Sequence, residues 1–240
     1  MMTPPAWCDH GRGCHDGDVP SHASAPEASR AWLLIESDGP WAEHAVETPL
    51  PGDLGKLALA ADELGIRVQL IRRPARGDRD GAGHVFAAWT VGPRPWLADV
   101  TASADRLDLK ALAAGERVAE GTAVERMYLV CAHGRRDRCC ARLGAPLARA
   151  LAADYRDELW ETTHVGGHKF AANLVLLPHG RYYGPCDLDT ARAAITAYER
   201  GAVLPDRYRG RAGQPAAAQE AEYAALRRGA RGHRRPLHSP

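Results

Sequence analysis

Residues 126–140 read Arg-Met-Tyr-Leu-Val-Cys-Ala-His-Gly-Arg-Arg-Asp-Arg-Cys-Cys, and the rest of the chain is organised around this stretch. Its apolar start predicts a buried strand that ends at Cys131. Residues 139–153 are rich in alanine and leucine and predict a helix, for which Asp137 is a suitable cap. Residues 158–162 predict a second strand, which ends just before His164. A strand, a helix and a strand in this order imply parallel pairing through a right-handed crossover.

The rest of the chain places similar elements around this unit. Downstream, a strand pair and a closing helix are predicted at 172–177, 181–183 and 189–201. Upstream, the same order of strand, helix, three strands and helix is predicted at 31–36, 53–65, 67–71, 84–90, 96–100 and 105–114. The sequence therefore predicts an α/β fold with a thioredoxin-like mixed sheet and flanking helices, as two similar units in tandem. One larger α/β sheet whose halves resemble each other by chance is the alternative.

Composition changes along the chain indicate four regions. Residues 1–29 are rich in Pro, Gly, Ser and Asp and predict a disordered leader. Residues 30–120 form the predicted N-terminal unit and residues 121–203 the C-terminal unit. Residues 204–240 are expected to contain a loop, a helix over 216–228 and a basic tail.

The overall composition excludes several classes of protein. The chain has 240 residues, 45% of them apolar and 25% charged, with a net charge of +1. These values predict a soluble globular protein and argue against nucleic acid as the main partner. We expect no membrane segment and no signal peptide, and hence a cytoplasmic location. In a reducing cytosol, the six cysteines are expected to include metal ligands or reactive thiols rather than a disulfide framework.

Cysteines and histidines follow the predicted ends of two neighbouring strands. Cys131 ends the first strand, Cys139 and Cys140 begin the helix, and His164 and His168 follow the second strand. Loops that leave adjacent parallel strands converge at one sheet edge, so these side chains are expected to meet. Thiolate sulfur and neutral imidazole nitrogen are ligands that iron and zinc prefer. The sequence therefore predicts one metal centre, with either Cys139 or Cys140 as the second sulfur.

Several residues near these ligands are expected to support the centre. Gly166 and Gly167 lack Cβ atoms, so the loop can turn sharply and pass close to a bulky cluster. His133 is expected either to donate a hydrogen bond to a ligand sulfur, without itself binding the metal, or to face water. Cys186 is predicted to be a partly buried thiol. The leader cysteines, Cys8 and Cys14, are left without a role.

Four motifs together resemble the sucrase/ferredoxin-like family over about residues 30–228. They are Trp32-Leu-Leu-Ile-Glu36 with Gly39-Pro-Trp41, Cys131-x-His-Gly-x-Arg-Asp-x-Cys-Cys140, His164-x-Gly-Gly-His-x-Phe-Ala171 and Tyr208-Arg-Gly-Arg211. The resemblance implies a thioredoxin-like ferredoxin whose [2Fe-2S] cluster is held by two cysteines and two histidines. Carried over by motif, the ligands are Cys131, Cys140, His164 and His168, with Cys139 as the alternate ligand.

The resemblance implies an electron carrier rather than a stand-alone enzyme, with a redox partner protein that the sequence does not identify. Replacing two thiolates with neutral imidazoles brings the formal charge of an oxidised cluster from about −2 to about zero, which favours reduction. Two alternatives stay open: a thiol oxidoreductase that uses the vicinal pair Cys139 and Cys140, and a structural Cys2His2 zinc module. No pair of carboxylates with glycosidase spacing accompanies these motifs.

The N-terminal unit is predicted to carry no cofactor. The positions that match Cys131 and the histidine loop fall near Ser37-Asp-Gly39 and Arg72-Arg-Pro-Ala-Arg76, which offer no soft ligands. Its expected role is to cover one side of the C-terminal unit, with Trp41 and Trp96 as candidates for the contact.

Overall fold

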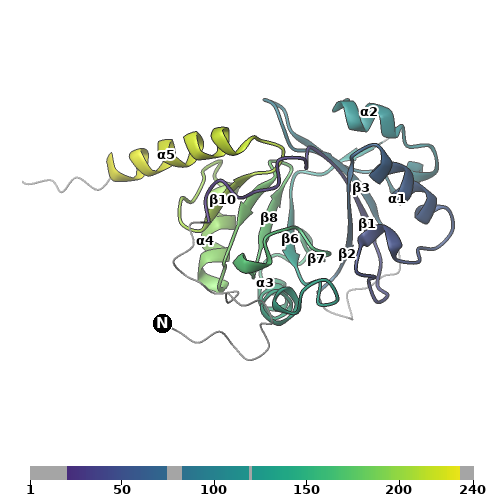
Figure 1. The fold of residues 1–240 in the computed structure, drawn as a ribbon, viewed down its shortest axis with the longest axis horizontal. Helices are drawn as coiled ribbons and strands as arrows, with labels where there is room; N and C mark the ends of the chain where they lie inside the picture. Colours follow the sequence, from purple (N-terminus) through teal and green to yellow (C-terminus); the bar gives the residue numbers. More distant parts are fainter. Residues whose placement is uncertain (1–20, 75–82, 119–120, 233–240) are drawn as a thin grey trace, which may run out of the picture.

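The structure is a computed structural model that describes residues 21–74, 83–118 and 121–232. Its strands are β1 (Ala31–Glu36), β2 (Arg67–Arg72), β3 (Val85–Trp89), β4 (Trp96–Asp99), β5 (Thr122–Ala123), β6 (Met127–Cys131), β7 (Leu159–Thr162), β8 (Leu174–Leu177), β9 (Arg181–Tyr183) and β10 (Tyr208–Arg211). In the described part of the chain, these ten strands form one mixed sheet in the order β10-β9-β8-β6-β7-β2-β1-β3-β4-β5 (Figure 1). The predicted mixed α/β fold is confirmed.

The same pairing pattern occurs in both halves of this sheet. β1 pairs parallel with β2 and antiparallel with β3, and β3 pairs antiparallel with β4. β6 likewise pairs parallel with β7 and antiparallel with β8, and β8 pairs antiparallel with β9. The halves join where β2 pairs antiparallel with β7, at Ile71 opposite Thr162 and Arg72 opposite Glu161. The halves thus share one continuous sheet, and their existence as separate thioredoxin-like units stays a prediction.

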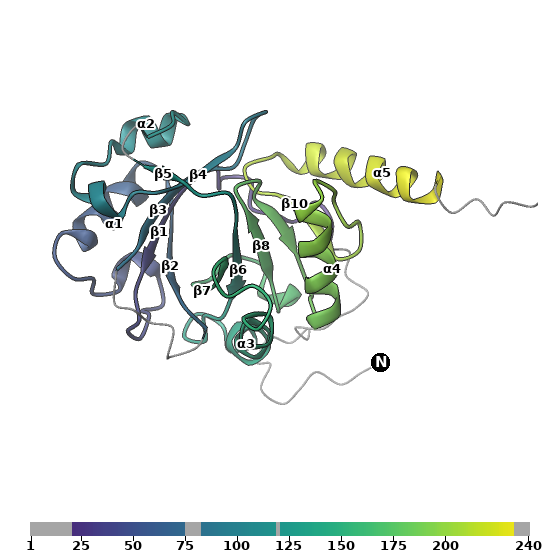
Figure 2. The same cartoon turned by 180° about the vertical axis from the view of Figure 1, so that it is seen from behind.

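Helices cover the outer faces of the curled sheet. They are α1 (Leu54–Glu63), α2 (Leu109–Ala114), α3 (Ala145–Leu151), α4 (Leu188–Glu199) and α5 (Ala216–Gly232), with the 3-10 helices η1 (Ala45–Glu47), η3 (Thr101–Arg106) and η5 (His168–Phe170) and the π-helical turn η4 (Cys140–Gly144). Figures 1 and 2 show α1 and α2 on the first half and α3 and α4 on the second. Among the described residues, no helix combines the length and the apolar character that crossing a membrane requires.

Side chains of alternating strand positions divide the core into layers. Leu33 of β1 packs against the α1 and α2 side, and Val130 of β6 packs against the α3 and α4 side. Their neighbours, including Trp32 and Leu129, point the other way, into a central core that both halves share. Cys131 is two positions after Leu129 in the same strand, so its side chain points the same way and enters the central core. The fold therefore directs this thiol toward the contact between the halves.

The tryptophans predicted at this contact behave differently from each other. Trp41 meets His133 of the second half edge-on, with ring centroids 5.7 Å apart. Trp96 lies within the core of the first half, so its predicted place at the contact was wrong. The large aromatic residues of the central core are instead Trp32, Phe86, Trp160 and Tyr182.

The segment predicted as a loop before the last helix contains the strand β10. Tyr208 pairs with Tyr183, and a register shift follows before Gly210. A strand of only four residues that contains a bulge and a glycine has little apolar alternation, which is why its sequence resembles a loop. α5 then extends away from the body of the protein in Figure 1.

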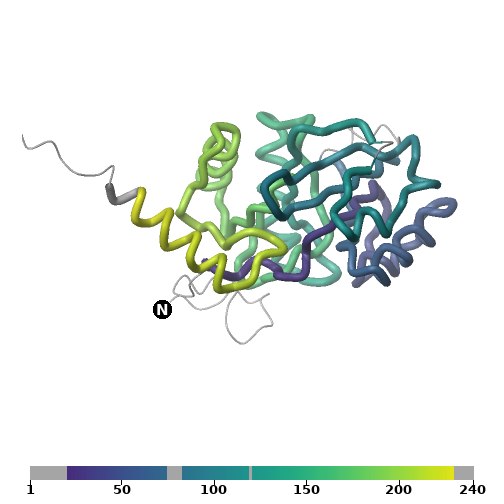
Figure 3. Tube along the Cα trace, turned by 90° about the horizontal axis from the view of Figure 1, so that it is seen from above, coloured from purple at the N-terminus to yellow at the C-terminus, as the bar shows by residue number. Residues whose placement is uncertain are grey.

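Residues 21–29 are ordered, so the disorder predicted for residues 1–29 was wrong for this part. Figure 3 shows the segment running beside α5. The N–H groups of Ser24 and Ala25 donate to the carbonyl oxygen of Arg209 at 2.8 and 3.2 Å. The buried Gln219 of α5 also accepts from the N–H of Ala25 and donates to its carbonyl oxygen, at 3.1 and 3.0 Å. These contacts join residues that are far apart in the sequence, so no local sequence pattern indicates them. Residues 1–20, with Cys8 and Cys14, and residues 233–240 of the predicted basic tail lie outside the described residues.

Candidate metal centre

Cys131 is the last residue of β6 and is fully buried. Its N–H donates to the carbonyl oxygen of Asn173 at 3.0 Å, which holds the strand end against the segment before β8. The parallel neighbour β7 ends at the same level, with Thr162 opposite Cys131. The chain after β7 therefore leaves the sheet beside this thiol, as the sequence predicts.

Cys140 reaches the same place through the loop and the turn that follow β6. The carboxylate of Asp137 accepts from the N–H of Cys139 at 2.8 Å, which confirms the predicted capping role. The π-helical turn then brings Gly144 against the end of β6. A Cβ atom at Gly144 would lie 1.8 Å from the carbonyl oxygen of Cys131. Only a glycine permits this approach, which brings the start of the turn close to β6.

The adjacent cysteines point in different directions. Cys140 belongs to the central core together with Cys131. Cys139 packs with Ala171 and with the partly buried Leu143. Residues one position apart cannot share a helix face, so only Cys140 of the two lies beside Cys131 and His164. The same separation removes the geometric basis for a reactive pair formed by Cys139 and Cys140.

His164 completes a compact group of three ligands. Its Nδ1 lies 3.6 Å from Sγ of Cys140. The ligand atoms of Cys131, Cys140 and His164 all lie within 4.8 Å of one another. Such a group can hold a metal ion.

His168 lies beside this group but is not part of it. It begins η5, its side chain is 42% exposed, and its ring centroid is 6.3 Å from that of His164. Its Nδ1 lies 3.6 Å from the buried carboxylate of Asp137. The structure thus brings three of the four predicted ligands together and places the fourth at the rim. Ligation by His168 stays a prediction.

The two buried thiols shift each other's pKa in opposite directions. A hydrogen bond from Cys140 lowers the pKa of Cys131 well below its usual value, and a further bond from His164 acts in the same direction against burial. The neighbouring Cys131 and burial both raise the pKa of Cys140. These opposite shifts favour ionisation of Cys131 over that of Cys140, and the thiolate is the form that binds metals.

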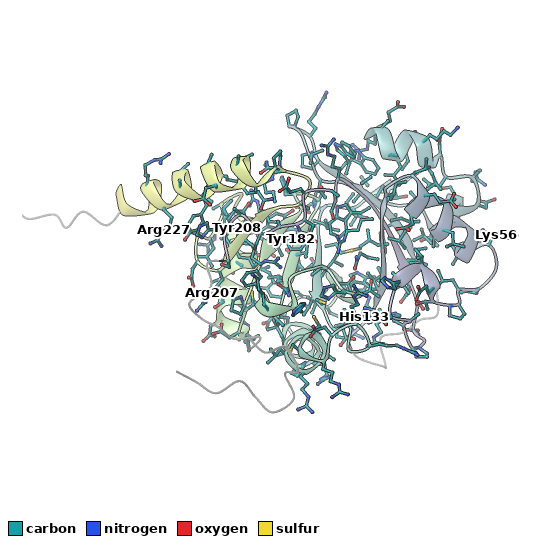
Figure 4. All side chains as sticks on the ribbon, in the orientation of Figure 1. Lys56, His133, Tyr182, Arg207, Tyr208 and Arg227 are labelled. Atoms are coloured by element: carbon teal, nitrogen blue, oxygen red, sulfur yellow. The ribbon has the colours of Figure 1, made fainter. Side chains whose placement is uncertain are left out.

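His133 supports the centre by a contact other than the predicted one to a sulfur. It is buried, and its Nδ1 accepts from the N–H of His164 at 3.2 Å. Its Nε2 lies 2.8 Å from the carbonyl oxygen of Ala42, to which it donates. Burial lowers the pKa of His133, so the neutral form that makes both bonds is favoured. Figure 4 shows the side chain between the two halves.

The first half contributes a further contact that sequence reasoning missed. Arg67 of β2 donates through Nη2 to the carbonyl oxygen of His164 at 3.0 Å, and through Nη1 to Ser29 at 2.8 Å. The available signal was an arginine in a strand that is otherwise mostly buried. An open cavity of about 480 Å³ adjoins these residues, and its lining includes Arg67, His133, Arg136 and His164.

The glycines of the histidine loop make the predicted sharp turn, and their close approach to a cluster stays a prediction. Gly166 and Gly167 have φ values of +92° and +74°, which strain any other residue. A Cβ atom at Gly167 would lie 2.4 Å from Nη2 of Arg209. The loop therefore passes directly over the buried Arg209, a residue of the Tyr208–Arg211 motif for which the sequence predicts no role.

Replacing His133 with leucine is expected to weaken metal binding about 10- to 100-fold, the usual effect of removing an outer-shell partner. The N–H of His164 would lose its acceptor, and the imidazole would lose its fixed position. Competition between the protein and a chelator for Co²⁺ measures the change. His179→Leu is the matched control, because His179 is paired with Tyr198 at 2.7 Å and lies away from the ligand group. Equal affinities of His133→Leu and the unaltered protein would contradict the supporting role.

Comparisons with known proteins found one family model and one curated relative that match this chain. The sucrase/ferredoxin-like family model matches residues 23–210. A curated relative, altered inheritance of mitochondria protein 32 of Meyerozyma guilliermondii, is 30% identical over 97 residues. That alignment covers 36% of this chain and 34% of the relative, so the chain spans only about a third of the relative's length. No solved structure matches.

Proposed function

Because this chain belongs to the sucrase/ferredoxin-like family, we propose that it is an electron-transfer protein with a [2Fe-2S] cluster held by Cys131, Cys140, His164 and His168. The observation that carries the proposal is the convergence of two buried thiols and an imidazole within 4.8 Å, with a second imidazole beside them. When bound, the cluster would supply one-electron oxidation and reduction.

The residues around the centre fit such a group chemically. The donor set contains only sulfur and imidazole nitrogen, which iron–sulfur clusters use. Asp137 lies near His168, and His133 and Arg67 fix the backbone of His164. Buried surroundings exclude water from the thiols, whereas the partial exposure of His168 opens one edge of the site.

That edge suggests where a redox partner protein would approach. Arg135, Arg138 and Lys169 flank the ligands in sequence and are exposed. Exposed cations around an electron-transfer site favour a partner with an acidic surface and speed its association at low salt. We therefore propose an acidic redox partner protein at this face.

A structural zinc site is the second candidate, and one observation favours it. Three ligand atoms within 4.8 Å match a single tetrahedral ion, with His168 or another group as the fourth ligand. The thiol oxidoreductase alternative would have to use Cys131 and Cys140, because these two cysteines lie in one core cluster whereas Cys139 packs with Ala171.

Anaerobic purification followed by metal analysis tests the proposal. We expect a coloured protein with about two irons and about two acid-labile sulfides per chain, because each [2Fe-2S] cluster contains that number. The variant with Cys131→Ser and Cys140→Ser, prepared in parallel, is the blank. A colourless protein with one zinc per chain would support the structural site instead, and a metal-free protein would contradict both metal proposals.

A further inference from the structure

The histidine loop, residues 164–168, is held in place through its carbonyl oxygens. Four consecutive carbonyls, those of residues 164–167, each accept a hydrogen bond from a side chain of another segment. The donors are Arg67 of β2 to His164 at 3.0 Å, Tyr182 of β9 to Val165 at 3.3 Å, Arg209 of β10 to Gly166 at 3.1 Å, and Asn173, just before β8, to Gly167 at 3.1 Å. Figure 4 shows Tyr182 inside the second half. The conformation of the loop therefore depends on side chains that lie outside it.

Among these donors, Asn173 also contacts the other ligand segment. Its carbonyl oxygen accepts from the N–H of Cys131 at 3.0 Å, while its side-chain Nδ2 donates to the carbonyl oxygen of Gly167 at 3.1 Å. One residue therefore bonds both the strand end that carries Cys131 and the loop that carries His164 and His168.

Arg209 fixes the orientation of this amide. Its Nη1 donates to Oδ1 of Asn173 at 2.7 Å and also to the carbonyl oxygen of Gly166 at 3.1 Å. Because Oδ1 faces a donor and Nδ2 faces an acceptor, only one of the two orientations of the amide satisfies both neighbours. The chain at Gly184 closes the space beside it, since a Cβ atom there would lie 2.7 Å from Oδ1. The amide is thus bonded at both ends and closely packed.

The burial of Asn173 indicates that these bonds are what its side chain contributes. It is the polar residue of the otherwise apolar run Ala171–Leu177, and it is fully buried. Burying an amide costs free energy unless its groups are hydrogen-bonded. An apolar residue of the same size would fill the core without that cost, but it would leave the loop and the guanidinium without a partner.

We infer that Asn173 is a positioning residue that sets the histidine loop against Cys131 before a metal binds, with Arg209 fixing its amide. The effect on the loop belongs to the folded chain, whereas the effect on metal binding rests on the proposed function. Ligands that are already held at their spacing lose less conformational freedom on binding, so the affinity for a metal is higher. Removing the amide should therefore loosen the loop in the metal-free protein and weaken metal binding.

Amide hydrogen exchange of the metal-free protein tests the first effect. Asn173→Leu keeps about the size of the side chain but removes the amide. The N–H of Phe170, which donates to the carbonyl oxygen of Gly167 at 2.9 Å, is then expected to exchange about tenfold faster. Gln219→Met is the matched control and should leave this rate unchanged, because Gln219 is also a fully buried amide but bonds to Ala25 and not to the histidine loop. An unchanged rate in Asn173→Leu would overturn the inference.

Competition with a chelator for Co²⁺ tests the second effect. Asn173→Leu is expected to bind Co²⁺ about 10- to 100-fold more weakly, whereas Gln219→Met should bind it as the unaltered protein does. A role in core stability alone would lower the stability of both variants and leave both affinities equal, and this result would overturn the inference. If the unaltered protein binds no Co²⁺, the proposed metal centre is refuted, and the exchange rates alone decide whether Asn173 positions the loop.

Asn173→Asp replaces Asn173→Leu in the exchange experiment if the leucine variant does not fold. A carboxylate still accepts from Arg209 but cannot donate to the carbonyl oxygen of Gly167, so the same faster exchange of the Phe170 N–H is expected. Exchange at the rate of the unaltered protein would overturn the inference in this variant as well.

Discussion

Cys140→Ser is expected to abolish metal binding, whereas Cys139→Ser is expected to leave the metal content and the absorption spectrum nearly unchanged. Serine retains the size of the side chain but removes the thiolate that binds the metal. The loss of a direct ligand should exceed the roughly 10- to 100-fold effect of outer-shell changes. Cys139 is the adjacent control, because it is equally buried but packs against Ala171. Cys139 is disulfide-bonded, so its replacement also removes a cross-link, and a loss of stability without a loss of metal is the expected result.

Iron, sulfide and zinc analysis of both serine variants, purified anaerobically, measures this difference. Circular dichroism in the far ultraviolet shows whether each variant is folded. Loss of the metal in Cys139→Ser, with retention in Cys140→Ser, would move the ligand by one position and contradict the geometry of the turn.

Gly144→Ala is expected to cause the largest loss of stability of any single methyl addition near the site, about 3 kcal/mol or more. The new Cβ would lie 1.8 Å from the carbonyl oxygen of Cys131 and 2.9 Å from its carbonyl carbon. Both atoms belong to the backbone of a central strand, so neither can move without displacing the ligand Cys131. The backbone angles of Gly144, φ −76° and ψ −44°, suit alanine, and the effect is therefore purely steric.

Urea unfolding of the metal-free protein measures this loss, and chelator competition measures the accompanying change in metal affinity. Gly55→Ala in α1 is the matched control, because a Cβ there meets nothing within 4 Å. It is expected to be neutral or to stabilise the helix by up to about 1 kcal/mol. Gly144→Ala with the stability of the unaltered protein would show that the close approach to β6 is not essential.

Local patterns were sufficient for most of the elements and for the identity of the ligand pairs. Apolar runs identified β1, β6 and β8, whose residues are all buried. The strand, helix and strand around Cys131 implied the parallel pair β6 and β7, and hence the meeting of Cys131 with the loop of His164. Strand alternation and crossover handedness act within a few residues or between consecutive elements, so sequence alone carries them.

Residue patterns alone did not indicate whether Cys139 or Cys140 would be the second sulfur ligand, although the family resemblance favoured Cys140. The turn that follows Asp137 places Cys140, and not Cys139, beside Cys131 and His164, because one residue along a helix rotates a side chain by about 100°. The position of His168 at the rim likewise depends on the left-handed backbone of Gly166 and Gly167. The sequence suggested a sharp turn there but not its direction.

Local sequence patterns were therefore enough to predict the mixed α/β fold, the strand ends that carry the proposed ligands and the soft donor set. Which residues surround those proposed ligands depends on the tertiary structure. Ser24 and Arg209 are 185 positions apart, and Ala42 and His133 are 91 apart, yet each pair is hydrogen-bonded. A buried charge or a buried imidazole is placed by partners that converge only after the chain has folded, and no periodicity along the chain records which partners those are.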